Sequence, residues 1–180
     1  MQSEFEMTDL GEMTYFLGME INQSADGIFV CQRKYANEIL KKFNMENCNP
    51  VSTPLVQNQK LCREDGASKV DESMYRNLVG CLLYLTTTRL DLMYASSLLS
   101  RFMNEPREIH FRAAKRVLRY IKGSADLGIW FRKSEKFNLV GFTDSDWVGS
   151  LDDMRSTSGY VFSLNSGAFC WLSKKQENVA

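Results

Sequence analysis

Short apolar runs alternate with polar segments at the start of the chain, and this pattern predicts a β-hairpin followed by a helix. Residues 15–21 and 27–31 are rich in aromatic and β-branched residues, and the polar segment 22–26, typical of a turn, separates them. Over residues 34–45 the apolar positions recur every three or four residues, which is the period of an amphipathic helix.

The middle of the chain is predicted to be helical after a long polar connection at 51–70. Apolar residues keep helical register over 72–86, over 91–103, and again from near Arg107. Gly123 follows the last of these patterns and is the expected C-cap.

The third helical pattern is strongly two-sided. Its apolar residues share one face, and five cations with no acid among them gather on the other: Arg112, Lys115, Arg116, Arg119 and Lys122. Such a stripe could follow a phosphate backbone, where each neutralised phosphate adds salt-sensitive affinity. A solvated helix face has the same pattern, so both interpretations stay open.

The C-terminal part of the chain is β-rich, with four further strand patterns at 127–131, 137–143, 159–164 and 168–172. One of these strands runs directly into Asp144, so that carboxylate is expected at a strand end, where oxygen ligands can hold Mg²⁺. Asp146 is expected to lie in the following turn. Asp-rich turns are more often solvated loops, and the residues alone leave the choice open.

The composition is that of a folded protein with no net charge, in which the charges are unevenly distributed along the chain. At 180 residues with 44% hydrophobic content the chain can bury a core, as one domain or two small ones. The net charge of zero excludes a globally basic nucleic-acid binder. The charge is nevertheless polarised, since residues 1–30 hold no Lys or Arg whereas residues 101–123 hold seven.

Five cysteines without a C-x-x-C pair and a single histidine, His110, indicate neither a zinc site nor a disulfide framework. Buried reduced thiols are expected, which favours a reducing, intracellular compartment. A single histidine also argues against a hydrolase triad, and His110 is expected to be a surface or capping residue. No signal peptide or membrane span is visible, so no membrane partner is expected.

One short motif suggests a different class of function. Arg116-Val117-Leu118-Arg119 fits an R-x-L-R pattern, but four loosely defined positions inside an amphipathic helix match by chance often.

Taken in order, these segments resemble the C-terminal part of the Pol polyprotein of copia-type LTR retrotransposons, along essentially the whole chain. The resemblance is carried by nine segments: 5–11 and 15–21, then 75–80, 83–85, 88–91 and 115–123, and finally 143–147, 155–160 and 171–176. The first pair is similar to the reverse transcriptase just after its catalytic hairpin, the middle four to its thumb and connection, and the last three to the opening strands of an RNase H domain.

The resemblance implies an α+β fold in which a β-hairpin and a helical thumb or connection region precede a truncated RNase H-like mixed sheet. Residues 1–50 would be the end of the palm, with a primer-grip-like hairpin and the first thumb helix, and 51–70 a linker. Residues 71–125 would be the helical thumb and connection region, and 126–180 an incomplete RNase H-like domain. A sheet without the helices that follow it would leave an apolar face uncovered.

The resemblance also implies roles for individual residues. Asp144 would be the first RNase H carboxylate positioning Mg²⁺, the cofactor of the parent family. Phe16, Leu17 and Gly18 would help to hold the primer terminus. The basic helical face would border the channel for the RNA/DNA hybrid or primer-template.

Departures from the family pattern lead us to expect no activity from this chain alone. The Tyr-x-Asp-Asp polymerase motif is expected before Met1, and the remaining RNase H ligands after Ala180, in the rest of the polyprotein. Leu90 stands where the family usually has Pro, and Val148 and Ser150 replace the usual Ala and Asp. The expected function is therefore that of a fragment of a reverse transcriptase/RNase H polyprotein, catalytically inactive alone and with residual RNA/DNA-hybrid binding, in the cytoplasm or nucleus.

The alternative is a secreted effector of the RxLR type, acting without catalysis in a host plant cell. It rests on the motif at 116–119, which in that family follows a signal peptide, whereas here it lies deep in the chain. Export would favour this second interpretation.

Overall fold

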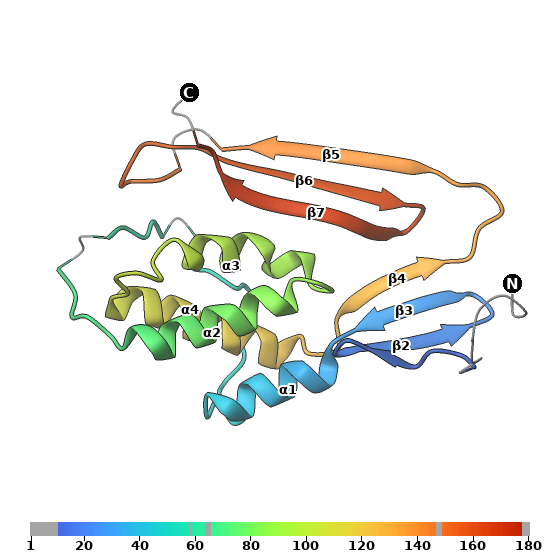
Figure 1. Ribbon diagram of the computed structural model, residues 1–180, viewed down its shortest axis with the longest axis horizontal. Coiled ribbons are helices and arrows are strands. Elements are labelled where there is room, and N and C mark those ends of the chain that lie inside the picture. Colours follow the sequence, from blue (N-terminus) through green and yellow to red (C-terminus); the bar gives the residue numbers. More distant parts are fainter. Residues whose placement is uncertain (1–10, 58, 64–65, 147–148, 178–180) are drawn as a thin grey trace, which may run out of the picture.

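The computed structural model describes residues 11–57, 59–63, 66–146 and 149–177. In these residues four α-helices and two antiparallel sheets form a mixed α+β fold, as expected from the sequence at that coarser level. Figure 1 shows a helical body with one sheet beside it and the second sheet lying across α3. The segment 5–10 and Trp147, which belong to the motifs above, lie outside the described residues.

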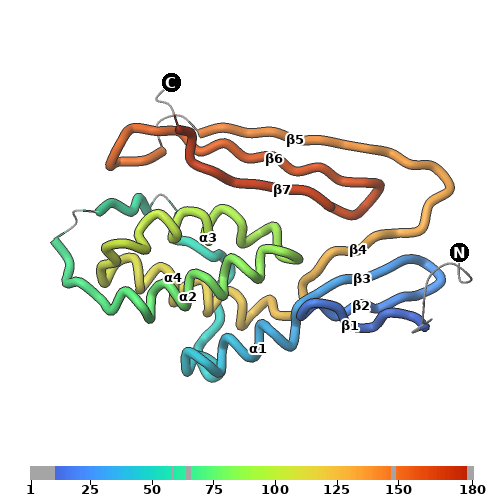
Figure 2. The backbone as a smooth tube through the Cα atoms, in the orientation of Figure 1, coloured from blue at the N-terminus to red at the C-terminus, as the bar shows by residue number. Residues whose placement is uncertain are grey.

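The predicted hairpin is present in the first sheet, but its first run is broken. Strand β1 (Tyr15–Phe16) ends at a turn, and β2 (Met19–Ser24) then pairs with β3 (Gly27–Cys31). Leu17 and Gly18 in that turn have positive φ angles of 47° and 76°. The pattern of apolar residues cannot show this reversal, because both flanking strands are apolar. Figure 2 shows β1 beside β2 at the edge of the sheet.

The fourth strand of this sheet comes from a distant part of the sequence. Strand β4 (Gly128–Arg132) pairs antiparallel with β3, from Gly27 opposite Arg132 to Cys31 opposite Gly128. Thus a strand in the range expected for the RNase H-like domain is hydrogen-bonded to the hairpin. The domain boundary at 126 stays a prediction.

All predicted helices are present in the helical body. They are α1 (Arg33–Lys42), α2 (Glu72–Leu85), α3 (Met93–Ser100) and α4 (Glu108–Gly123), with one 3₁₀ turn, η1 (Leu90–Leu92), leading into α3. Asp71 caps α2 by accepting a 2.6 Å hydrogen bond from the Met74 backbone N–H. The predicted glycine cap of α4 is one residue early, because Gly123 is the last helical residue and Ser124 is the C-cap.

The core lies between the four helices, α1 to α4. Its fully buried side chains recur at helical spacing, as in Leu78, Leu82, Val117 and Ile121. Tyr75 is also buried, and its hydroxyl donates a 2.9 Å hydrogen bond to the Leu99 carbonyl. Burial raises the pKa of Tyr75 well above its ordinary value.

The single histidine is a core residue, which corrects the expected surface position. His110 is fully buried and stacks on the Phe102 ring at 3.9 Å between centroids. Its Nδ1 accepts from the Arg107 backbone N–H at 3.0 Å, so the expected capping role is confirmed. Its Nε2 lies 2.9 Å from the Cys62 carbonyl, which fixes the part of the connection around Cys62 to α4.

The long connection between α1 and α2 is attached to the start of α4 near its own C-terminal end. The Glu108 backbone N–H donates to the Ser68 carbonyl at 2.9 Å, and Val70 donates to Pro106 at 3.1 Å. Leu61 in its middle is buried. A polar composition therefore does not leave this segment detached from the fold.

The second sheet is a meander of β5 (Leu139–Ser145), β6 (Thr157–Leu164) and β7 (Gly167–Lys175). The Trp171 indole N–H donates to the Thr86 carbonyl at 2.9 Å and fixes β7 to the end of α2. On the opposite face Phe162, Leu164 and Leu172 are exposed, so apolar side chains meet solvent there. Among the described residues no helix has the length and apolar character needed to cross a membrane.

Candidate nucleic-acid and carboxylate sites

The predicted primer-contacting residues form an exposed turn that α2 holds in place. Leu17 is 69% exposed and Phe16 is about half exposed. The Tyr84 hydroxyl donates a hydrogen bond to the Leu17 carbonyl, and the Tyr84 ring meets Tyr35 edge-on at 4.8 Å. A Cβ at Gly18 would lie 2.6 Å from the Tyr84 hydroxyl oxygen, so both the positive φ and the close approach require glycine. The turn therefore presents Phe16 and Leu17 from a fixed backbone.

Three of the five cations on α4 extend into solvent. Arg112 forms an i,i+4 ion pair with Glu108 at 3.1 Å, which is worth little on an exposed surface. The Lys115 ammonium lies 4.5 Å from the centre of the Phe111 ring, and Lys122 is exposed in the last turn. A cation in the last turn interacts favourably with the helix dipole.

The other two cations are occupied within the protein. Arg116 donates from Nη2 to the Thr53 hydroxyl at 3.0 Å, and Arg119 donates from Nε to the Asn49 carbonyl at 2.8 Å. Both side chains therefore anchor the start of the connection to α4. The sequence pattern treats the five cations as equivalent, because the partners lie 63 and 70 residues away.

The R-x-L-R motif has its two central residues in the core. Val117 and Leu118 are 0% exposed, and the flanking arginines make the hydrogen bonds just described. In the folded chain these four residues are therefore a structural part of α4.

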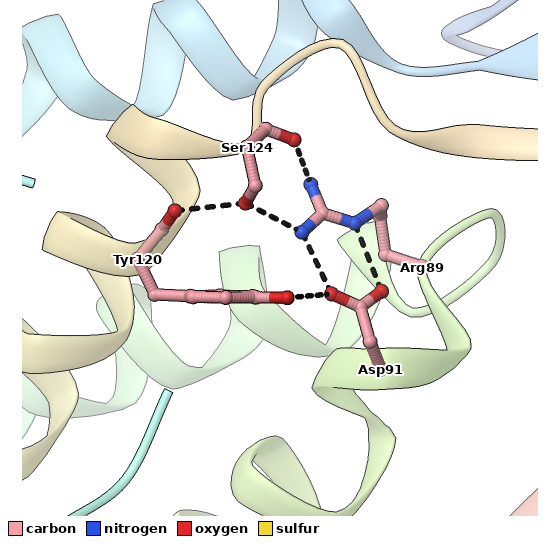
Figure 3. Close-up of polar contacts among 4 residues, drawn as sticks. All are labelled: Arg89, Asp91, Tyr120 and Ser124. Atoms are coloured by element: carbon pink, nitrogen blue, oxygen red, sulfur yellow. Dashed lines mark hydrogen bonds and ion pairs between the residues drawn. The ribbon is translucent and has the colours of Figure 1, made fainter. Parts of the chain in front are cut away.

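A buried arginine cluster, which the pattern does not predict as a site, joins η1 to the end of α4. The Arg89 side chain is 3% exposed and forms a two-pronged pair with Asp91, at 2.9 Å from Nε and 2.7 Å from Nη2. On its other side it donates to the carbonyl and the hydroxyl of Ser124, both at 2.8 Å (Figure 3). Arg89 thus provides a donor to the C-cap of α4.

Tyr120 completes the cluster and affects its protonation. Its hydroxyl donates to the Asp91 carboxylate at 2.9 Å, as Figure 3 shows. Burial acts to raise the pKa of Asp91, but the hydrogen bonds and charge of Arg89 outweigh it and hold that pKa below the ordinary value. The pKa of Tyr120 is raised by burial and by its bond to the carboxylate.

Asp144 lies inside β5, one residue before its end, and not just beyond the strand. It is exposed, and its Oδ1 accepts a 2.9 Å hydrogen bond from the Ser145 backbone N–H. Asp146 follows the strand as expected, and its carboxylate accepts from the Thr157 backbone N–H. Both aspartates line a cavity of about 380 Å³ between the second sheet and the start of α3.

The carboxylates do not complete a metal centre. Within the described ranges, no three His, Cys, Asp or Glu side chains are grouped so that they could hold a metal ion. Asp152 instead accepts from the Arg63 backbone N–H at 2.9 Å, and Asp153 pairs with Lys175 at 2.6 Å. The hydrogen bond from Lys175 lowers the pKa of Asp153 to about 2. The described residues therefore show no complete metal site, and no catalytic step follows from them; Mg²⁺ at Asp144 stays a prediction.

The three predicted site groups are not joined by polar contacts among the described residues. Among the described residues, no hydrogen bond or ion pair joins the turn at 16–18, the α4 cations and Asp144 to one another. The turn belongs to the first sheet and Asp144 to the second, with the helical body between them in the sequence.

Comparisons with known proteins identify the family. The family described as reverse transcriptase (RNA-dependent DNA polymerase) matches residues 1–57. The Pol polyprotein of transposon RE1 from Arabidopsis thaliana is 39% identical over 179 residues, which are 99% of this chain. The chain belongs to the copia-type Pol polyprotein family. It spans 12% of the RE1 polyprotein's length.

Two shorter proteins are similar to this chain over three quarters of their own length. An uncharacterized mitochondrial protein of Arabidopsis thaliana is 41% identical over 181 residues, and the match covers all of this chain and 75% of the mitochondrial protein. Secreted RxLR effector protein 161 of Plasmopara viticola is 45% identical over 107 residues, and the match covers 59% of this chain and 75% of the effector. No solved structure shows a significant match. The recognition of a Pol polyprotein is confirmed, and the effector similarity is partial.

Proposed function

We propose that this Pol segment binds an RNA/DNA hybrid or primer-template through the exposed cations of α4, without cleaving it. The observation that carries the proposal is the row of Arg112, Lys115 and Lys122 on the solvent face of one helix. Membership of a reverse-transcriptase family supports a nucleic-acid partner. The rest of the polyprotein would be a second partner. Reverse transcriptases are generally Mg²⁺-dependent, so Mg²⁺ is the metal to include when activity is tested.

The chemistry of the row favours backbone contacts over base reading. Lysine ammonium groups on flexible stems are point charges that attract phosphates without selecting a sequence. Since Arg116 and Arg119 are bonded to the connection, we assign them to positioning α4 and not to the nucleic acid. The exposed Phe16 and Leu17 would add a stacking surface at a primer end.

The experiment compares two double variants of equal charge. K115A/K122A removes two cations of α4, and K133A/K136A removes two exposed lysines from the loop between β4 and β5. For an RNA/DNA hybrid, the logarithm of the binding constant falls linearly with the logarithm of the salt concentration. We expect the size of this slope to decrease by about two for the first variant and to stay unchanged for the second. Fluorescence anisotropy measures both. Equal effects of the two variants would contradict the proposal.

The absence of cleavage is part of the same proposal and needs its own measurement. Its support is that Asp146 is occupied by the Thr157 backbone, which leaves Asp144 as the one pocket carboxylate without a long-range partner among the described residues. Incubation of a labelled hybrid with the chain and Mg²⁺ is expected to leave the RNA strand intact. Cleavage that disappears in D144N would overturn this part.

A second candidate function is a secreted effector, favoured by the similarity to the Plasmopara viticola protein. The relevant experiment is export of the chain from an oomycete and its detection in plant tissue. R116K/R119K keeps two positive charges and hydrogen-bond donors on α4 but removes both arginines of the R-x-L-R motif. Loss of uptake in that variant would support the effector function. Unchanged distribution would remove this candidate.

A further inference from the structure

The cavity beside Asp144 has walls and charge that the hybrid-binding role does not use. Apolar side chains come from two separate elements: Leu90, Met93 and Tyr94 from η1 and α3, and Phe142, Val161 and Trp171 from the second sheet. Phe142, Val161 and Trp171 are cross-strand neighbours, so they form one continuous row facing the helix. The volume of about 380 Å³ is within the range of small-molecule sites.

Two parts of the cavity wall are held in place before any ligand arrives. The indole of Trp171 is fixed by its hydrogen bond to the Thr86 carbonyl, and the 3₁₀ turn carrying Leu90 is fixed by the Arg89 cluster. Phe142 is 63% exposed and Tyr94 is about half exposed, so both rings have an open surface. Fixed walls reduce the ordering cost of binding.

The charge of the cavity is negative. Its lining includes Asp144 and Asp146 but no Lys, Arg or His among the described residues. Asp146 is already engaged by the Thr157 backbone, and Arg101 lies near enough to interact with its charge. Asp144 forms no ion pair within the part of the chain that the structure describes, and its hydrogen bond to Ser145 is local. The carboxylate therefore faces an aromatic cavity without a counter-charge.

We propose that this cavity binds a small organic cation with a flat apolar body, such as an amidinium or guanidinium carried on a ring. The cationic group would lie beside Asp144, and the apolar body would lie between Tyr94, Phe142 and Trp171. Aromatic faces attract cations, and a carboxylate gives the amidinium two oxygen acceptors. This site goes beyond hybrid binding and does not depend on it, since it involves none of the α4 cations.

The test uses three probes of one shape on the full chain in buffer with a chelator. Benzamidinium is cationic, benzamide is neutral and benzoate is anionic. We expect benzamidinium to bind at least about fivefold more tightly than benzamide, and benzoate not to bind. NMR shift mapping is expected to place the effect at Trp171 and along β5. Equal binding of benzamidinium and benzamide, or no benzamidinium binding at millimolar concentration, would overturn the proposal.

Two variants and a control locate the charge. D144N keeps the side chain's shape, and we expect it to lose the preference for benzamidinium over benzamide. F142L, on the exposed edge strand, is expected to weaken both of these probes equally. D126N removes another exposed carboxylate, which pairs with Arg33 at 2.7 Å outside the cavity, and it should change neither the affinity for the probes nor the preference for benzamidinium. An unchanged preference in D144N, or a loss in D126N, would show that Asp144 does not recognise the cation.

Discussion

At the scale of single residues, the guanidinium of Arg89 joins segments that are far apart in the sequence. Thr88-Arg89-Leu90-Asp91 stands out as a motif in the sequence. Tyr120, which donates to Asp91, lies 29 residues after it, and Ser124, which accepts from Arg89, lies 35 residues after that arginine. No local period links them. The role of such a residue becomes visible only when the fold brings its partners together, because a lone arginine after a helix is usually solvated.

Replacing Arg89 with methionine keeps most of the side chain's length and removes the charge and the donors. We expect R89M to lower the free energy of unfolding by about 3 kcal/mol, because the Asp91 carboxylate and the Ser124 carbonyl lose their partner. Urea unfolding followed by circular dichroism gives the value. R112M is the matched control, since Arg112 forms an exposed ion pair, and its cost should stay below about 1 kcal/mol. Equal costs would show that burial of the pair is unimportant.

The lowered pKa of Asp91 predicts how stability depends on pH. A carboxyl whose pKa is lower in the folded state stabilises the fold above its unfolded pKa, and this contribution is lost as pH falls through the folded value. The stability gap between the wild type and D91N should therefore be largest near neutral pH and shrink below about pH 4. Unfolding curves at a series of pH values measure the gap. A gap that is constant with pH would contradict the assigned protonation.

At the scale of elements, the sequence predicts which segments are helices or strands better than it predicts where they turn and pair. The periods identify the four helices of the described residues, since apolar residues recur at helical spacing in each. The break at Leu17 and Gly18 is not visible in the pattern, because two apolar strands adjoin directly. The pairing of β4 with β3 is not visible either, because strand partners depend on the path of the helices between them.

The turn at 16–18 allows the cost of backbone conformation to be separated from the cost of a close contact. We expect G18A to destabilise the chain by about 2 kcal/mol, because its φ is 76° and the new Cβ would meet the Tyr84 hydroxyl. Gly66 has the same φ of 76°, but a Cβ there would have no atom of a described residue within 4 Å, so G66A should cost only about 1 kcal/mol for its backbone conformation. Thermal unfolding compares them. Removing the hydroxyl with Y84F should recover part of the loss in G18A; no recovery would refute the contact.

At the scale of the whole molecule, the buried apolar side chains are concentrated in the helical body. Those of the second sheet are at most half-buried, and the described part of β5 is exposed apart from Val140. The indole of Trp171 and the hydrogen bond from Arg101 to the Thr157 hydroxyl at 2.9 Å join the two parts. A protein organised in this way should open in steps, because the part with less buried area has the smaller local stability.

Hydrogen exchange tests this order of opening directly. We expect the amides of β5 and β6 to exchange faster than those of α2 and α4, since the sheet can separate while the helical core stays packed. W171F keeps an aromatic ring but loses the bond to Thr86, so exchange in the sheet should accelerate about fivefold while α2 and α4 are unchanged. W130F is the control, because Trp130 packs on Phe29 in the first sheet at 6.0 Å between centroids. If W171F accelerated every amide equally, the sheet and the helices would be one cooperative unit, and the cavity between them would open only on global unfolding.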